Sequence, residues 1–301
     1  MSPEGAAGAR PQLAVIIVNF NAGDHLRDCL ESVRADLADE HWTAVVVDNA
    51  SNDGSADRVA AWSPRLTIIS NDINRGFGAA VNQGARKQDA PLIWILNPDC
   101  RVEPGAFRAL ESALAAHPDA AIAASQLLNE DGTTQESARG EPSAATGLFG
   151  RHGLLTRFLP QSKAARRNLR AADLVASASA AEPYPAIDWA MGASLLIRRE
   201  LFERVGGFDE RFFLYWEDAD LCRRLRDLGY TIRYVPAARV VHVGGRSART
   251  ARRLAVHAFH RSAYLYYATH VAPAPLSPRR AVARAILGTR CWMQLLAAAW
   301  R

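Results

Sequence analysis

Glu217, Asp218 and Asp220 lie close together in the run FFLYWEDAD, residues 212–220. The aromatic side chains just before these acids would form an apolar wall, and burial beside such a wall raises the pKa of a carboxyl group. A carboxylate with a raised pKa is a stronger base and suits general-base catalysis. The alternative is structural, because acids at the start of a helix are favoured by the helix dipole.

Asp99 ends the run LNPD, directly after an apolar stretch. A hard divalent ion such as Mg²⁺ or Mn²⁺ takes oxygen ligands and keeps several waters, so one carboxylate and the phosphates of a substrate can hold it. Pro98 restricts the turn that presents the carboxylate. We therefore expect Asp99 to bind Mg²⁺ or Mn²⁺. The alternative is that it caps the helix that follows Pro104.

Polar side chains also follow two other apolar runs, LAVIIV at 13–18 and AVVV at 44–47. Amide, carboxylate and hydroxyl groups at the end of a buried strand can hydrogen-bond a base or a ribose. The alternative is a turn with a helix cap. The residues concerned are Asn19, Asn21, Asp48, Asn49 and Ser51.

A glycine-rich segment, NRGFGAAVN, occupies residues 74–82. It approaches the G-x-G-x-x-G dinucleotide fingerprint, but Val81 stands where a small residue is needed and the motif is not in the first strand–helix turn. We therefore reject dinucleotide binding. Gly76 and Gly78, with Asn74 and Asn82 beside them, can still let the backbone approach a diphosphate at a helix N-terminus.

These candidates need a scaffold, and the apolar pattern predicts one. Continuous apolar runs predict buried strands, and segments of helical period lie between them. Strands that alternate with helices at this spacing predict a doubly wound, largely parallel sheet, whose ligand site lies past the carboxyl ends of the strands. We expect strands at 13–18, 44–47, 66–69, 92–96, 121–125 and 193–197, and helices at 24–33, 55–61, 78–87, 105–117, 199–205 and 217–228. Residues 140–185 show no clean period and predict a long acceptor loop or lid.

Charge is distributed unevenly along the chain. Residues 228–301 contain twelve arginines and no Asp or Glu, although the whole chain carries a net charge of only +5. A basic tail on an acidic body indicates an anionic partner, while the alternative is a general arginine bias. The four cysteines are widely spaced, which argues against a zinc ribbon or disulfide scaffold and favours a cytoplasmic protein.

Taken together and in this order, the motifs resemble family 2 inverting glycosyltransferases of the GT-A fold. The matching pieces are VIIVNFN, VVDNASNDGS, NRGFGAAVNQG, ILNPD, MGASLLIRRELFERVGGFDERFFLYWEDADLCRRL and VVHVGG, spread over residues 13–245. The resemblance implies an α/β fold with a doubly wound, Rossmann-like mixed sheet. Within the family, GFDERFFLYWEDADLCRRL and the basic tail are similar to bacterial rhamnosyltransferases that act on polyprenyl-diphosphate-linked N-acetylglucosamine.

The resemblance also implies roles for single residues. Asp218 is the expected base, with Glu217 as the alternative, and the family's D-x-D metal motif falls on residues 97–99, where Asn97 replaces the first acid. The nucleotide is expected near the strand ends and the loop after Asp48. His242, beside two glycines, either contacts the diphosphate or lies on the surface. Expected acceptor-side residues are Trp189, Met191, Gly192 and Trp216, although both tryptophans can equally belong to the core.

The implied reaction moves a sugar, L-rhamnose from a dTDP donor or another hexose from a UDP or dTDP donor, onto a hydroxyl of a lipid-linked or cell-wall glycan. Two other classes of protein compete with this interpretation. A sugar-phosphate nucleotidyltransferase needs a Gly-rich, Arg-bearing loop after the first strand, which NFNAG at residues 19–23 does not provide. A nucleic-acid-binding module would explain the tail but leave the acids without a role, so we expect no nucleic-acid partner.

The C-terminal segment predicts an amphipathic helix. At about 100° per residue, its arginines fall within an arc of about 140°, and apolar residues lie opposite, although Leu287 and Leu295 break the pattern. The arginines are Arg279, Arg280, Arg284, Arg290 and Arg301, and the apolar residues are Val282, Ile286, Trp292, Met293, Leu296 and Trp300. We expect this helix to bind an anionic membrane surface, at the inner face of the cell membrane. The alternative is a helix docked on the body through the same apolar face.

The expected organisation has four parts. They are a disordered tail (1–10), a nucleotide-sugar-binding half (11–130), an acceptor-binding and catalytic half (131–250) and a basic, membrane-associating helical tail (251–301).

Overall fold

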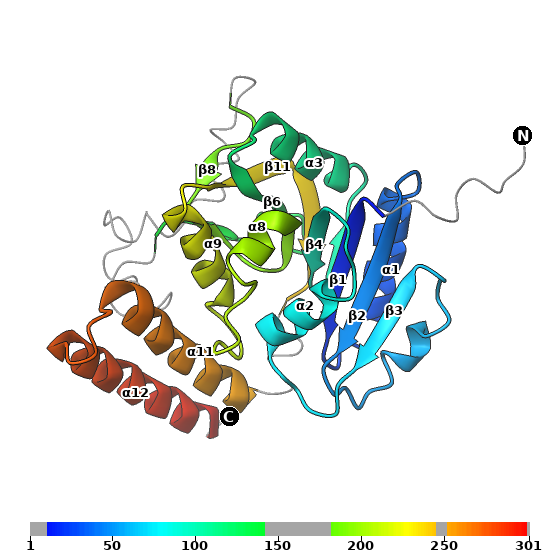
Figure 1. The fold of residues 1–301 in the computed structure, drawn as a ribbon. Helices are drawn as coiled ribbons and strands as arrows, with labels where there is room; N and C mark the ends of the chain where they lie inside the picture. The colour runs from blue at the N-terminus through cyan, green and yellow to red at the C-terminus, as the bar shows by residue number, and fades with distance from the viewer. Residues whose placement is uncertain (1–10, 142–181, 245–251, 300–301) are drawn as a thin grey trace, which may run out of the picture.

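The computed structural model describes residues 11–141, 182–244 and 252–299. The predicted tail at 1–10 and most of the predicted acceptor loop at 140–185 lie outside these residues. A nine-stranded sheet runs through the centre of the molecule, in the order β3-β2-β1-β4-β10-β6-β11-β5, with β8 paired to β11 (Figure 1). Its strands are β1 (Leu13–Asn19), β2 (Trp42–Asp48), β3 (Leu66–Ser70), β4 (Leu92–Leu96), β5 (Cys100–Val102), β6 (Ala120–Leu128), β8 (Ala186–Ile187), β10 (Ser194–Arg198) and β11 (Thr231–His242).

The first four strands of this order, β3, β2, β1 and β4, are parallel and form the edge that carries the predicted nucleotide site. Their continuous apolar runs are buried on both faces, as expected of parallel strands covered by helices. The second half of the sheet is mixed, because β10 lies antiparallel between β4 and β6. The mixed α/β fold is thereby confirmed, and the expectation of a largely parallel sheet holds only for the first half.

Helices cover both faces of the sheet. Alternate residues of β1 point to opposite faces, so Val15 packs toward α1 (His25–Asp36) and α3 (Ala106–Ala116), whereas Ile16 faces the other layer. That second layer contains α2 (Phe77–Ala85), α8 (Arg199–Arg204) and α9 (Glu217–Asp227). The two layers hold the ends of β1, β2 and β4 at one edge, where α2 and α9 begin.

The structure differs from the sequence prediction at several elements, among them the short strands at 100–102, 138–139, 186–187 and 189–190, which were not predicted. The predicted helix at 55–61 is only a 3₁₀ turn, Asp57–Val59. The long strand β11 was not predicted, because Arg233 and Arg239 interrupt its apolar pattern and Pro236 falls at a shift in its pairing with β6.

A short second sheet pairs β7 (Ala138–Arg139) with β9 (Trp189–Ala190) and places the start of the predicted acceptor segment beside α9.

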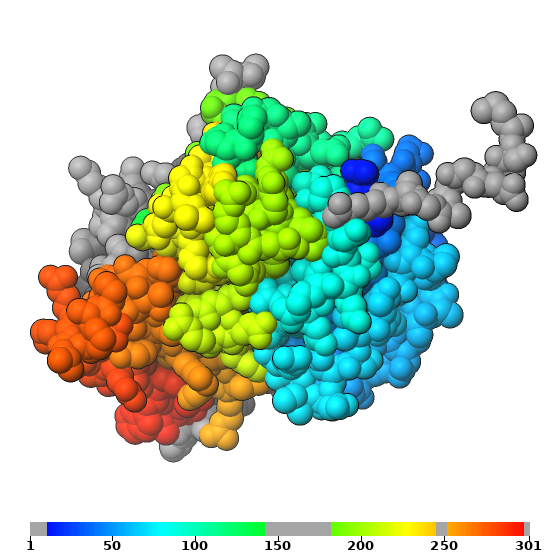
Figure 2. All heavy atoms as spheres, viewed as in Figure 1, coloured from blue at the N-terminus to red at the C-terminus, as the bar shows by residue number. Residues whose placement is uncertain are grey.

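The chain ends in a helical hairpin that packs on the side of α9. It consists of α11 (Arg252–Tyr266), the π-helical segment η3 (Tyr267–Val271) and α12 (Pro278–Ala299). Figures 1 and 2 show the two long helices, in orange and red, as an outer layer with α11 nearer the sheet. The predicted C-terminal helix is thus confirmed. Within the described part of the chain, no helix combines the length and the apolar character needed to cross a bilayer.

Candidate active site

The ends of β1 and β2 are joined by a buried hydrogen-bond network. Asn19 and Asp48 are paired in the strand register, and Asn19 Nδ2 donates to Asp48 Oδ1 at 2.6 Å. The same amide nitrogen lies 3.1 Å from Ser51 Oγ and 2.8 Å from Ser55 Oγ. Asn19 is completely buried. It therefore lies beneath the predicted nucleotide site, where it fixes the loops that face solvent.

The loops above Asn19 have unusual backbone conformations. Asn21 and Ala50, which follow β1 and β2, have positive φ angles of 53° and 66°. Such conformations are costly for residues other than glycine and persist where the surroundings impose them. Ser51 Oγ accepts a hydrogen bond from the Asn21 N–H, and Asn21 Oδ1 accepts one from the Asn52 N–H. The two loops therefore brace each other, and Asn21 and Ser51 remain half-buried beside the opening.

Asn49 connects this network to the glycine-rich segment. Its amide nitrogen donates to Asn74 Oδ1 and to the Gly76 carbonyl, both at 3.0 Å. Its amide oxygen accepts hydrogen bonds from Asn71 Nδ2 and the Arg75 N–H, both at 3.1 Å. Every hydrogen-bonding group of this buried side chain is thus paired within the protein.

The glycines and Asn82 of this segment have partners inside the fold. A Cβ at Gly76 would lie 2.3 Å from the Phe213 carbonyl oxygen, and one at Gly78 would lie 2.9 Å from Phe208 Cβ. The Phe77 N–H, at the start of α2, donates to that Phe213 carbonyl oxygen at 2.9 Å. Asn82 bonds the backbone of Phe208 through both amide atoms. These contacts pack α2 against the loop before α9 and give the segment a structural role. They do not test diphosphate binding, which stays a prediction.

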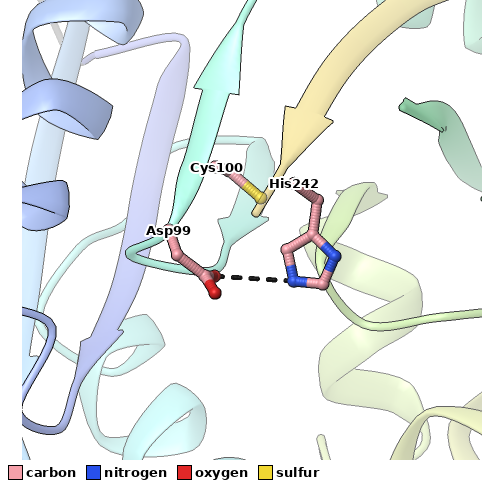
Figure 3. Close-up of side chains that lie close together, drawn as sticks. All are labelled: Asp99, Cys100 and His242. Carbon is pink, nitrogen blue, oxygen red and sulfur yellow. Dashed lines mark ion pairs between the residues drawn. The ribbon is translucent and has the colours of Figure 1, made fainter. Parts of the chain in front are cut away.

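Asp99 and His242 meet at the ends of β4 and β11 (Figure 3). Asp99 Oδ1 lies 3.5 Å from His242 Nε2, and Asp99 Oδ2 accepts the Gly244 N–H at 3.1 Å. Asn97 Nδ2 lies 3.3 Å from His242 Nε2. The sequence did not predict this proximity, because it left His242 open between contact with the diphosphate and a place on the surface; its role in binding a ligand stays a prediction. The cap that was the alternative role for Asp99 belongs instead to Asp36, which accepts the N–H groups of Gly105 and Phe107 at the start of α3.

This arrangement fits a divalent cation. His242 Nδ1 lies 3.0 Å from Gln135 Oε1, so with a cation present Nδ1–H can donate to Gln135 while the Nε2 lone pair binds the metal. Burial acts to raise the pKa of the Asp99 carboxyl, but His242 and the Gly244 N–H outweigh it, so this pKa lies below its usual value. The ionised Asp99 carboxylate and the His242 Nε2 atom therefore lie close enough together to bind the same cation.

Cys100 also has its ligand atom within 4.8 Å of those of Asp99 and His242. However, the thiol is buried and contacts the Ala193 carbonyl oxygen, and burial raises its pKa well above the usual value. A protonated thiol is not a metal ligand, and Mg²⁺ and Mn²⁺ prefer oxygen. The candidate cation site therefore consists of Asp99 and His242.

The two carboxylates at the start of α9 differ in their surroundings. Asp218 Oδ2 accepts the Gly192 N–H at 3.0 Å, and its Oδ1 accepts the Ala219 N–H at 2.8 Å. Glu217 is buried, and its Oε2 has no hydrogen-bond partner among the described residues. Burial raises the pKa of Asp218 to about 6 and, with the nearby Asp218 charge, raises that of Glu217 to about 8. At neutral pH, Asp218 is therefore the ionised member of the pair.

The residues predicted to contact the acceptor lie on both sides of Asp218. Gly192 is next to its carboxylate, and the Phe77 ring is 3.4 Å from the position of a Cβ at Gly192. Trp216 directly precedes α9 and has a positive φ of 69°. Its ring packs against that of Tyr266, with the ring centroids 5.2 Å apart. Trp189 lies further along, where its indole donates to the Gly140 carbonyl, and Met191 N–H donates to Ser137 O. Both tryptophans are partly buried and pack against the core.

One backbone contact connects the cation site to the base. The Asn97 N–H donates to the Ala193 carbonyl, so the strand end that carries Asp99 lies beside the turn that binds Asp218. The sequence did not indicate Gln135, which also donates to the His242 carbonyl at 2.6 Å and orients this residue through two contacts. No local pattern marks Gln135, because only the fold brings it to His242.

Comparisons with known proteins agree with this geometry. Residues 14–175 match the model of glycosyl transferase family 2, and residues 152–298 match that of glycosyl transferase family group 2. Over 273 residues, 85% of this chain and 84% of the relative, the chain is 35% identical to an N-acetylglucosaminyl-diphospho-decaprenol L-rhamnosyltransferase of Mycobacterium tuberculosis. It is 46% identical to rhamnosyltransferase WbbL of Escherichia coli over 56 residues, 19% of this chain and 21% of that protein.

Two solved structures are similar in fold. The mannosyltransferase PcManGT from Pyrobaculum calidifontis, in complex with GDP-Man and Mn²⁺, superposes with a TM-score of 0.54 at 18% identity, over 97% of this chain and 80% of that chain. GalNAc-T7 with UDP, GalNAc and Mn²⁺ gives a TM-score of 0.55 at 19% identity, over 77% of this chain and 44% of that chain. The mixed sheet, the motifs at its strand ends and the matched relatives lead to one conclusion. The chain belongs to glycosyl transferase family 2 and is a glycosyltransferase of the GT-A fold.

Proposed function

We propose that the protein is an inverting rhamnosyltransferase that moves L-rhamnose from a dTDP donor onto a polyprenyl-diphosphate-linked sugar. The 35% identity to the mycobacterial rhamnosyltransferase over 85% of this chain supports both the sugar and the class of acceptor. The observation that carries the chemistry is the Asp218 carboxylate, which the N–H groups of Gly192 and Ala219 hold at the start of α9.

The reaction is a single displacement. The acceptor hydroxyl oxygen attacks the anomeric carbon of the donor while the bond from that carbon to the diphosphate breaks. The diphosphate leaves with the electron pair, and the hydroxyl proton passes to Asp218. Attack from the face opposite the leaving group inverts the anomeric centre. Burial strengthens Asp218 as a base, because it raises the pKa of this carboxyl to about 6.

Asp99 and His242 would hold the divalent cation, Mg²⁺ or Mn²⁺. When bound, such a cation offsets the negative charge that develops on the leaving diphosphate. Two fold relatives were solved with Mn²⁺, which supports a divalent metal in this protein. Gln135 orients His242, and the Gly244 N–H orients the Asp99 carboxylate.

The loops after β1 and β2 would hold the nucleotide. Asn21, Asp48 and Ser51 lie at the strand ends, and their mutual hydrogen bonds fix the loops before a ligand arrives. Such a preorganised loop loses less conformational entropy on binding. Asn19 and Asn49 support these loops from below, because both are buried and hydrogen-bonded within the protein.

A panel of nucleotide sugars tests the proposal. The purified protein is incubated with each donor, Mg²⁺ or Mn²⁺ and a short-chain polyprenyl-diphosphate N-acetylglucosamine, and the lipid product is analysed by mass spectrometry. We expect a deoxyhexose mass increase with dTDP-L-rhamnose alone, with inverted anomeric configuration by NMR. Transfer of another hexose from a UDP or dTDP donor would keep the transferase assignment and overturn the choice of rhamnose.

A further inference from the structure

Helix α12 packs against α11 through the side of the helix that carries its arginines. Ala283 and Leu287 are buried in this contact, and Leu287 is one of the two residues that broke the predicted amphipathic pattern. Arg280 donates to the carbonyl oxygens of Ala268 and Ala272 at 2.6 and 2.7 Å and so ties α12 to the end of η3. The docked-helix alternative required the apolar face to be buried, and the structure shows the opposite orientation.

The apolar face of α12 consequently points outward. Val282, Trp292, Met293 and Leu296 are 57%, 63%, 51% and 42% exposed. At about 100° per residue, these four side chains fall within an arc of about 100°, which makes one continuous stripe. Isolated exposed apolar residues are ordinary, but a contiguous stripe of large ones marks an interaction surface.

Basic residues border the stripe. Arg279 and Arg284 are exposed on α12, one on either side of the apolar arc. No acidic residue occurs anywhere from residue 228 to the C-terminus, so nothing in this part of the sequence neutralises them.

We propose that the exposed face of α12 docks on an anionic lipid bilayer. Apolar side chains of this size gain free energy when they enter the interfacial region, and an indole suits headgroup depth. Flanking arginines extend their guanidinium groups to anionic headgroups while their methylene stems stay with the apolar residues. A second copy of the chain is a poorer occupant, because two such basic faces repel each other.

The docking face is rigidly connected to the catalytic helix. Ser262 of α11 donates to the Leu214 carbonyl at 2.9 Å, just before the catalytic acids. His270 of η3 lies 2.7 Å from Asp220 of α9. If the proposed lipid-linked acceptor is correct, this connection holds Asp218 at a constant position relative to the bilayer that carries the substrate. The docking itself stands on the exposed face and does not depend on that assignment.

Co-sedimentation with vesicles tests the proposal. The full-length protein is mixed with vesicles of phosphatidylcholine alone or of phosphatidylcholine with phosphatidylglycerol, at low and at high salt. We expect pelleting with the anionic vesicles that weakens at high salt. The variant Trp292→Ser/Met293→Ser/Leu296→Ser should bind about tenfold more weakly or worse, because each lost side chain removes apolar transfer free energy.

Matched controls separate this face from general exposure. Ile73→Ser and Leu228→Ser remove apolar side chains that are 71% and 55% exposed elsewhere on the molecule, and both should pellet like the wild type. Arg279→Gln/Arg284→Gln should weaken binding to anionic vesicles and leave the apolar stripe intact. Circular dichroism and melting temperature check that each variant is folded.

Three outcomes would overturn the proposal. One is wild-type protein that ignores anionic vesicles at low salt, and another is a triple variant that binds as well as the controls. The third is a dimer in light scattering that the triple variant dissociates, since the face would then join two copies. Hydrolysis of the nucleotide sugar in solution is measured in parallel. If the wild-type protein hydrolyses no nucleotide sugar, that result would count against the proposed function. It would not change the conclusion about membrane docking.

Discussion

Asp218 and Glu217 are neighbours in sequence, yet burial affects them differently. Asp218 keeps two N–H donors that stabilise its charge, so its pKa rises only to about 6. Glu217 has an unpaired buried oxygen and a pKa of about 8, so at neutral pH it carries a proton. A base must be ionised to accept a proton, which favours Asp218 over Glu217 for this role.

Asp218→Asn should therefore lower turnover by at least about 100-fold, because the usual contribution of a general base is lost. Donor affinity should change little, since the amide keeps the shape of the carboxylate. In the wild type, kcat/KM should fall as the pH drops through about 6, because protonation removes the base. The measurement is kcat/KM across pH for both proteins. Glu217→Gln is the control: it mimics the protonated acid and should remain active, and its inactivation would move the role to Glu217.

Asp99→Ala should abolish transfer and remove the metal dependence of donor binding. Asp99 is the acidic member of the cation site, and without it His242 offers a single imidazole nitrogen. Titration calorimetry of Mn²⁺ and of the donor, with and without chelator, measures this directly. Gln135→Ala is a milder comparison, because it removes the contact that orients His242 and should weaken Mn²⁺ about 10- to 100-fold. Full activity of the wild type in excess chelator would contradict the metal site.

The sequence indicated Asp99 and the asparagines after β1 and β2 because each follows an apolar run that ends a strand, and it indicated Glu217 and Asp218 because an aromatic run precedes them. It did not indicate which of them are buried. Asn19 and Asn49 are chemically suited to bind a nucleotide. However, both are buried, and the amide nitrogen of Asn19 and the whole side-chain amide of Asn49 already bond residues of the next strand end and of the glycine-rich segment. Which side chains are buried, and which groups they hydrogen-bond, depends on tertiary contacts that the local sequence pattern does not encode.

At the scale of elements, a buried carboxylate fixes the position of α9 against the C-terminal hairpin. Asp220 is 1% exposed and binds Arg224 of its own helix at 2.7 Å and His270 of η3 at 2.7 Å. Arg224 also donates to the Val205 carbonyl at the end of α8. Three helical segments therefore meet at one carboxylate, two residues after Asp218.

Asp220→Asn should destabilise the protein by about 3–5 kcal/mol, the usual cost of breaking a buried pair. Turnover should fall with little change in donor KM, because the first turn of α9 loses its anchor to η3. Asp227→Asn is the matched control on the same helix. The Asp227 side chain, which pairs with Arg223, is 52% exposed. The Asp227→Asn substitution should therefore lower the stability by less than about 1 kcal/mol. Equal melting temperatures for the two variants would show that the buried carboxylate does not anchor α9.

Elements with a continuous apolar run were predicted well, and interrupted ones were not. The strands β1, β2, β3 and β4 lie within a few residues of their expected positions, because uninterrupted runs of Val, Ile and Leu fit a strand buried on both faces. β11 pairs along most of its length with β6 although its own pattern is broken by arginines and Pro236. Its partner strand, and not its local sequence, determines its conformation.

At the scale of the whole molecule, a backbone contact joins the nucleotide side of the site to the catalytic side. The Phe77 N–H at the start of α2 donates to the carbonyl of Phe213, four residues before the catalytic acids. Gly76 makes this approach close, since its φ of 87° and its missing Cβ leave room for that carbonyl. Asn49 donates to the Gly76 carbonyl, so the loop after β2 is connected to the loop before α9 through two consecutive residues.

Gly76→Ala should therefore disturb both sides of the site at once. Gly76 has φ 87° and ψ 168°, a backbone conformation almost restricted to glycine, so an alanine there is strained by about 1–3 kcal/mol. The added Cβ, 2.3 Å from the Phe213 oxygen, forces α2 and the catalytic loop apart at a further cost of about 1–3 kcal/mol. Gly132→Ala is the control for an alanine at positive φ without a clash, because Gly132 has a φ of 81° and nothing within 4 Å of the added Cβ. We expect Gly76→Ala to raise donor KM and lower kcat together, whereas Gly132→Ala changes only the melting temperature. If Gly76→Ala is no worse than Gly132→Ala in both measurements, the contact between α2 and Phe213 does not couple the two sides.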